Sequence, residues 1–152
     1  MRADGPLHLL KLCVGAARVE DLAAWQARYA AAARAAGRDS RLRHVTRMWP
    51  RRAEEILDGG SLYWVFAGVA LARQRILALE EAIGEDGVRR CAIVLDPDIV
   101  RTEAQPRRPF QGWRYLADAD APSDLPAAAA EPDLPPQLQT ALAELGVVRR
   151  RA

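Results

Sequence analysis

The sequence predicts a single α+β domain with a mostly antiparallel or mixed central sheet and three to four helices. Short apolar runs typical of buried strands occur beside longer stretches with apolar residues every three or four positions, and the order lacks regular βαβ alternation. The 152 residues are 50% apolar and 28% charged, which is the composition of one globular domain. A chain of this length needs no disulfide or metal to form a core.

The first half of the chain predicts two strands and two helices. Residues 7–14 form an apolar run, which indicates a buried strand. Residues 20–36 carry apolar side chains at helical spacing up to Gly37, and their expected buried face includes Leu22, Trp25 and Tyr29. Residues 41–48 alternate like a strand, and a short helix is expected at residues 50–57.

The second half predicts further strands and one more helix. Residues 61–69 are apolar on both faces, which indicates a central strand covered on both sides. Residues 69–83 predict a helix, because Ala72, Ile76, Leu79 and Ile83 form one stripe at helical spacing. Additional strands are expected at 88–95, 99–102 and 111–116, with a loop at 103–109.

The composition divides the chain into three parts. Residues 1–116 carry the α+β pattern. Residues 117–135 combine prolines and alanines with five acidic residues and no base, which predicts a flexible acidic segment. Residues 136–152 predict a short C-terminal helix and a basic end.

Location follows from the cysteines and from the apolar runs. Cys13 and Cys91 each lie inside an apolar run, which favours buried reduced thiols in a cytoplasmic protein. His8 and Lys11 interrupt the run at 7–17, so we interpret it as a core strand and not as a signal peptide. No run approaches the ~20 apolar residues of a membrane span, and no membrane association is expected.

Common cofactor and metal motifs are absent from the sequence. Two histidines and two distant cysteines offer no zinc spacing. The chain has no phosphate loop, no dinucleotide fingerprint, no nucleophile elbow and no His-Glu-x-x-His helix. We therefore predict neither a metal nor a cofactor.

His44 and Thr46 are the weak candidates for catalysis. On a strand their side chains point the same way, so a histidine and a hydroxyl could act together in general base chemistry. The alternative is a core histidine whose polar atoms are satisfied, and we prefer that interpretation.

Four arginines surround this pair and are ligand-binding candidates. Arg43 and Arg47 lie on the other face of the expected strand, while Arg51 and Arg52 lie at the start of the next helix. There they could combine with free backbone amides to attract an anion. The alternative is a solvated arginine face.

A second basic segment spans residues 105–115 and mixes arginines with aromatic rings. Its ligand-binding candidates are Arg107, Arg108, Trp113 and Arg114. This mixture suits an anion with a flat ring, such as a nucleotide, through charge pairing and cation–π contact. The alternative is a loop that lies back over the sheet with Phe110 and Trp113 as lids.

Five segments together resemble the bacterial domain-of-unknown-function family 1489. They are Leu-Leu-Lys-Leu-Cys-Val-Gly at 9–15, Thr-Arg-Met-Trp-Pro at 46–50, Gly-Gly-Ser-Leu-Tyr-Trp at 59–64, Cys-Ala-Ile-Val-Leu-Asp-Pro at 91–97 and Arg-Pro-Phe-Gln-Gly-Trp-Arg-Tyr-Leu at 108–116. The resemblance spans roughly residues 7–116. It implies no particular reaction.

A weaker resemblance is to ASCH and other PUA-like domains. In those domains a short helix with a glycine turn precedes a core strand, as residues 50–60 precede Ser61 here. The resemblance implies a β-rich fold that binds RNA or a modified base. The basic residue usual after that turn is missing, because Ser61 and Leu62 stand in its place.

These observations favour a binding module for nucleic acid or a nucleotide-like anion. One alternative is a small hydrolase or transferase that acts on a phosphorylated metabolite with His44 as the base. Another is a protein-interaction domain whose acidic segment at 117–135 engages a partner or covers the basic face of its own domain.

Overall fold

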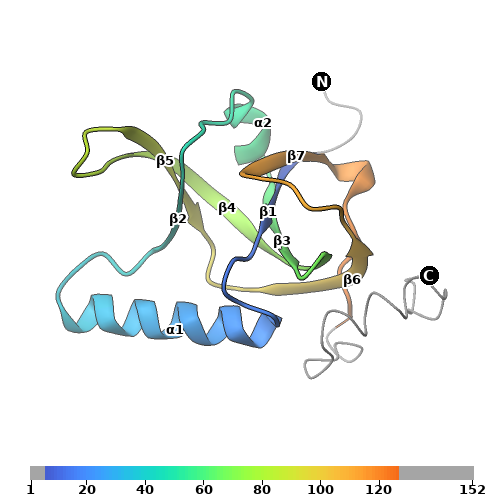
Figure 1. Cartoon of the computed structure of the whole chain (residues 1–152), viewed down its shortest axis with the longest axis horizontal. Coiled ribbons are helices and arrows are strands. Elements are labelled where there is room, and N and C mark those ends of the chain that lie inside the picture. Colours follow the sequence, from blue (N-terminus) through green and yellow to red (C-terminus); the bar gives the residue numbers. More distant parts are fainter. Residues whose placement is uncertain (1–5, 127–152) are drawn as a thin grey trace.

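Seven strands form one mixed sheet in the computed structural model, which describes residues 6–126 (Figure 1). The strands are β1 (Leu7–Leu12), β2 (Leu42–Thr46), β3 (Ser61–Phe66), β4 (Val69–Ile83), β5 (Arg89–Leu95), β6 (Val100–Pro106) and β7 (Trp113–Ala117). Their order is β2-β5-β4-β3-β1-β7, and β6 also pairs with β4. The pair β1–β3 is parallel and the other pairs are antiparallel, so the predicted mixed sheet is confirmed.

The prediction of three to four helices is wrong for the described residues. They contain α1 (Val19–Ala35), α2 (Ala53–Leu57) and the 3-10 turn η1 (Asp118–Asp120). Residues 69–83, expected as a helix, are instead the 15-residue strand β4. Alanine, leucine and glutamate there favour a helix locally, but β3, β5 and β6 all supply strand hydrogen bonds to this segment. Tertiary pairing overrides the local propensity.

Strand β3 is buried along its whole length, as predicted for a central strand. Leu62, Trp64 and Phe66 join the main apolar core, which lies under α1. Tyr63 and Val65 point the other way, into a second and smaller apolar cluster. The strand therefore separates two cores, because successive side chains alternate between its faces.

The second cluster lies inside a ring of strands. The ring runs through β6, β4, β3, β1 and β7, and the chain after β7 returns to β6. There Ser123 O accepts from Glu103 N at 2.8 Å, and Arg101 O accepts from Leu125 N at 2.9 Å. Residues 117–126, the start of the segment expected to be flexible, thus contact the sheet. The rest of that segment and the expected C-terminal helix lie outside the described residues.

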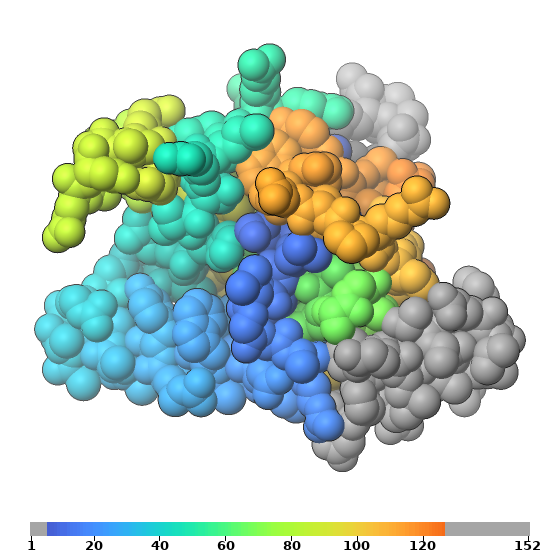
Figure 2. Space-filling model, in the orientation of Figure 1, coloured from blue at the N-terminus to red at the C-terminus, as the bar shows by residue number. Residues whose placement is uncertain are grey.

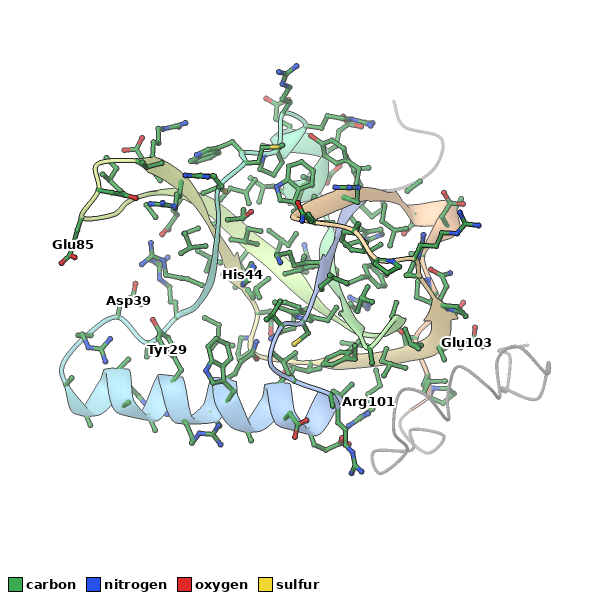
Figure 3. The ribbon with its side chains drawn as sticks, in the orientation of Figure 1. Tyr29, Asp39, His44, Glu85, Arg101 and Glu103 are labelled. Carbon is green, nitrogen blue, oxygen red and sulfur yellow. The ribbon has the colours of Figure 1, made fainter. Side chains whose placement is uncertain are left out.

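Helix α1 runs along one side of the sheet, and the β4–β5 ribbon projects at the other side (Figure 1). Glu85 marks the tip of that ribbon (Figure 3). Glu20 in the first turn of α1 forms an ion pair with Arg101 of β6, which fastens the start of the helix. Within residues 6–126, neither helix has the length and apolarity needed to cross a membrane.

Candidate anion-binding cleft

A hollow of about 600 Å³ lies where the end of β1 and the first half of α1 meet β2 and β3. We call it the cleft and define it by Lys11, Cys13, Trp25, Arg28, His44 and Trp64, which all line it. A volume of this size lies within the range of small-molecule sites.

The turn from β1 into α1 forms one wall of the cleft. Gly15 has φ +87°, so the reversal there favours glycine. Asp21 Oδ2 then accepts from the backbone N–H groups of Ala17 and Arg18, at 3.1 and 3.0 Å. Its carboxylate charge thus stabilises the start of α1. Asp21 also lines the cleft, where its negative charge acts on the neighbouring Cys13.

Lys11 and Arg28 supply positive charge to the cleft. Within residues 6–126, neither side chain forms an ion pair or a hydrogen bond. Lys11 comes from the end of β1 and Arg28 from the third turn of α1. Two cations against the one carboxylate of Asp21 leave the lining of the cleft with a net positive charge.

Aromatic rings provide the remaining surface. Trp25 was expected on the buried face of α1, but it is 53% exposed. The buried side chains of this helix include Leu22 and Gln26, so the buried face is rotated from the predicted one. Trp25 is therefore free to contact a ligand in the cleft.

A buried polar network holds Trp64 at the base of the cleft. Gln74 Oε1 accepts from Trp64 Nε1 at 2.9 Å and from Gln26 Nε2 at 2.9 Å. Gln74 Nε2 donates to Gln26 Oε1 at 2.9 Å and to Asp96 O at 3.0 Å. Gln74 is completely buried, and its amide is fully hydrogen-bonded, so the network orients the indole and ties α1 to β4.

His44 lies on the inner face of β2, and Tyr29 of α1 lies nearby (Figure 3). The imidazole ring of His44 meets the ring of Trp64 edge-on, with 5.3 Å between the ring centroids. Nε2 is buried and has no hydrogen-bond partner among the described residues. Burial, together with the charge of Lys11, lowers the pKa of His44 to about 4, so the imidazole is neutral at pH 7.

The cleft lacks an activated nucleophile among the residues that line it. Burial raises the pKa of the Cys13 thiol to about 11, so the sulfur stays protonated at neutral pH. His44 is neutral and Cys13 is a thiol, which is the opposite of a reactive thiolate–imidazolium pair. Thr46 shares the inner face of β2 with His44, but it is buried and does not line the cleft.

The two predicted basic segments meet beside the cleft. Trp113 Nε1 donates to Met48 O at 2.9 Å. Tyr115 Oη accepts from the backbone N–H groups of Arg51 and Arg52, at 2.9 and 3.2 Å. These two amides are therefore not free for an anion, in contrast to the expectation from sequence.

Lys11 connects this surface to the cleft. It is the cross-strand neighbour of Trp113 in the β1–β7 pair. In Figure 2 the end of β1 lies in the middle of the viewed face, between α1, the teal β2–α2 connection and the orange β6–β7 connection. Segments far apart in the sequence thus form one continuous surface.

The predicted arginines differ in how far their charges are used. Arg52 pairs with Glu55 at 2.7 Å, and Arg107 donates to Gln105. Arg114 lies over the Phe110 ring at 5.4 Å and donates to backbone carbonyls. The side chains without a hydrogen bond or ion pair to the described part of the chain are those of Arg43, Arg47, Arg51 and Arg108. Arg43 differs from the other three, because its Nε is buried.

Comparison with known proteins identifies the family. Residues 9–148 match the family described as "Protein of unknown function (DUF1489)". The chain belongs to this family. The match confirms the resemblance and extends it beyond residue 116, whereas the likeness to ASCH and PUA-like domains stays a prediction. No curated protein and no solved structure matches the chain.

Sequence reasoning missed Lys11, Trp25 and Arg28 of this DUF1489 domain as site residues. Lys11 is the single lysine of the chain and interrupts an apolar strand, which was a usable signal. Trp25 and Arg28 follow one another at helical spacing, but their exposure depends on the rotation of α1 against the sheet. That rotation is a tertiary property.

Proposed function

We propose that this protein binds a nucleotide-like anion in the cleft, meaning a flat ring that carries phosphate, either free or within a nucleic-acid strand. The observation that carries the proposal is the position of Lys11 and Arg28, both unpaired among the described residues, beside the rings of Trp25 and Trp64. A lysine, an arginine and aromatic faces are the groups that recognise phosphate and base together.

The aromatic rings of the cleft provide the proposed contact with the base. Trp25 is exposed and can stack on a base, whereas Trp64 is only 3% exposed and forms the floor of the cleft, where Gln74 holds it. Base stacking on an aromatic side chain contributes about 1–3 kcal/mol and tolerates any base, because every base has a π-face. The proposal therefore predicts affinity for the flat ring with modest sequence preference.

The cations supply the phosphate contacts. Lys11 and Arg28 lie in the cleft itself. Arg47, Arg51 and Arg108 lie on the adjoining basic segments and are exposed, so they would contact further phosphates of a longer strand. Each such contact releases counterions, which makes affinity fall with salt.

The alternatives have weaker physical support. A pKa of about 4 makes His44 a poor proton acceptor at neutral pH, which disfavours an enzyme that uses it as the base. The interpretation of residues 117–135 as a partner-binding acidic segment is disfavoured for the described part, residues 117–126. Asp124 already pairs with Arg73 of the same domain.

Fluorescence anisotropy with a labelled single-stranded oligonucleotide tests the proposal. Lys11→Gln and Arg28→Gln should each weaken binding, by about tenfold, since a charge-assisted contact contributes about 1.5–3 kcal/mol. Each change should also reduce the slope of log K against log salt by about 0.7. Arg38→Gln is the matched control and should leave both values unchanged, because Arg38 is exposed just beyond the end of α1 and does not line the cleft.

Competition separates the two sources of the ligand. Displacement of the labelled strand by a mononucleotide would show that both ligands use the cleft. If the Arg107→Ala, Arg108→Ala double variant then lowers the affinity for the strand and leaves that for the mononucleotide unchanged, the arginine segment contacts only the rest of the strand. Absence of binding at low salt, or binding that neither Lys11→Gln nor Arg28→Gln affects, would refute the proposal.

A further inference from the structure

A second hollow, of about 360 Å³, opens at the start of β1. We call it the mouth pocket and define it by His8, Tyr63, Arg73, Asp118 and Asp124, which come from β1, β3, β4, η1 and the chain after η1. It shares no lining residue with the cleft. Its polar side chains belong to the ring of strands and not to the surface proposed to bind nucleotides.

The hydrogen bonds of His8 determine its tautomer. Its Nδ1 accepts from the backbone N–H of Ser61 at 3.0 Å, so the ring proton must be on Nε2. Nε2 then donates to Asp118 Oδ1 at 2.7 Å. His8 is buried and both of its nitrogens are engaged, so it acts as a neutral support that fixes the position of the Asp118 carboxylate.

Arg73 is matched by the other carboxylate of the mouth pocket. Its Nε and Nη2 donate to the two oxygens of Asp124, at 2.8 and 2.7 Å. Its Nη1 donates to Ser61 Oγ at 2.9 Å. This bidentate pair neutralises one guanidinium with one carboxylate. His8 carries its proton on Nε2 alone, and Asp118 and Asp124 outnumber Arg73, so the lining of the mouth pocket has a net negative charge.

Tyr63 provides an independent indication of a ligand. Its side chain is buried, with 4% of the residue exposed, and it lines the mouth pocket. No group within residues 6–126 hydrogen-bonds its Oη. Burial raises its pKa to about 12, so the phenol keeps its proton. The ring is buried while the hydroxyl stays accessible in the mouth pocket, so Oη is available to hydrogen-bond a bound molecule there.

We propose that the mouth pocket binds a small organic cation, an ammonium or guanidinium group, with Asp118 as the anionic partner and Tyr63 Oη as a second hydrogen-bonding group. An anion is disfavoured because Arg73 is already paired and Asp118 would repel it. A metal ion lacks ligands here, since the described residues contain no group of three suitable side chains. This site is independent of the proposed nucleotide cleft.

Calorimetric titration of the full chain with agmatine, which carries both cationic groups, tests this site at physiological salt. Asp118→Asn keeps an oxygen to accept from His8 Nε2 but removes the charge, so affinity should fall about tenfold or more. Tyr63→Phe should weaken binding about fivefold through the loss of one hydrogen bond. Asp120→Asn in η1 is the control and should bind like the natural protein, since Asp120 does not line the mouth pocket.

Amide chemical shifts locate the bound agmatine. We expect the signals of Gly59, Ala121 and Ser123 to move and those of the cleft residues to stay. The proposal is overturned if agmatine gives no saturable binding up to about 10 mM. It is also overturned if Asp118→Asn and Tyr63→Phe, both folded by circular dichroism, bind as tightly as the natural protein. Binding of inorganic phosphate that Arg73→Gln abolishes would overturn it as well.

Discussion

The cleft and the mouth pocket are built on the same plan and carry opposite charge. In each, a buried polar side chain holds a lining residue: Gln74 orients Trp64 in the cleft, and His8 orients Asp118 in the mouth pocket. The net charge of each hollow depends on which of its charged side chains already form ion pairs within the fold. Asp124 cancels the charge of Arg73, whereas Asp21 keeps its charge while it accepts from two backbone N–H groups at the start of α1. Counting charged residues in a hollow is therefore not enough, because paired charges leave little field for a ligand.

The two hollows also differ in how much polar surface they leave unsatisfied. His44 Nε2 beside the cleft is buried without a partner, whereas both nitrogens of His8 are hydrogen-bonded. We expect the supports of the mouth pocket to contribute more to stability, and His44 to make the protein sensitive to acid.

The largest effect is expected at Gly60, which precedes β3 beside the mouth pocket. A Cβ there would lie 2.2 Å from Leu7 O and 2.5 Å from Ile56 O, and both are backbone atoms with little freedom to move. Gly60→Ala should lower the free energy of unfolding by at least about 3 kcal/mol in urea denaturation. Gly87→Ala is the control, since a Cβ there meets open space and only its φ of +75° costs about 1 kcal/mol. Equal losses in both variants would contradict the steric argument.

A somewhat smaller loss is expected from His8→Leu. It leaves the buried Ser61 N–H without an acceptor and Asp118 without its donor, which should cost about 2–3 kcal/mol. His8→Asn can still accept from Ser61 N–H through its side-chain oxygen, so urea denaturation should show about half that loss. If both variants are as stable as the natural protein, His8 is not the support that its geometry implies.

The smallest effect concerns pH and His44. Its pKa is about 4 in the folded protein, below the ordinary value of 6.5, so the unfolded chain binds the proton first. The free energy of unfolding should therefore decrease as pH falls from about 6.5 towards 4, by on the order of 2 kcal/mol from this residue.

A ring of similar shape that cannot be protonated provides the control. His44→Phe should remove this dependence between about pH 6.5 and 5, where the carboxylates with lowered pKa values, Asp39, Glu80 and Asp86, still remain charged in both proteins. Thermal unfolding across this pH range measures the difference. Parallel curves for the two proteins would show that the buried imidazole does not resist protonation.

Local sequence patterns determined several elements of this protein. Strand β3 was predictable because both of its faces are apolar, and α1 because its spacing is helical up to Gly37. The family was recognisable from its short segments, since residues 9–148 match it. The basic segments around Arg47 and Arg108 were visible as arginines beside aromatic residues.

Tertiary structure alone decided the rest. Strand β4 has helix-forming residues, and three neighbouring strands hold it extended. The cleft requires Lys11, Arg28 and His44 from three elements, and it depends on how α1 is rotated. His8 and Asp118 are 110 residues apart, and they meet because β7 pairs with β1. Local propensity depends on neighbouring residues in the sequence, so it can be predicted from the sequence. A charged or hydrogen-bonded site forms between distant segments, and only the folded sheet brings these together.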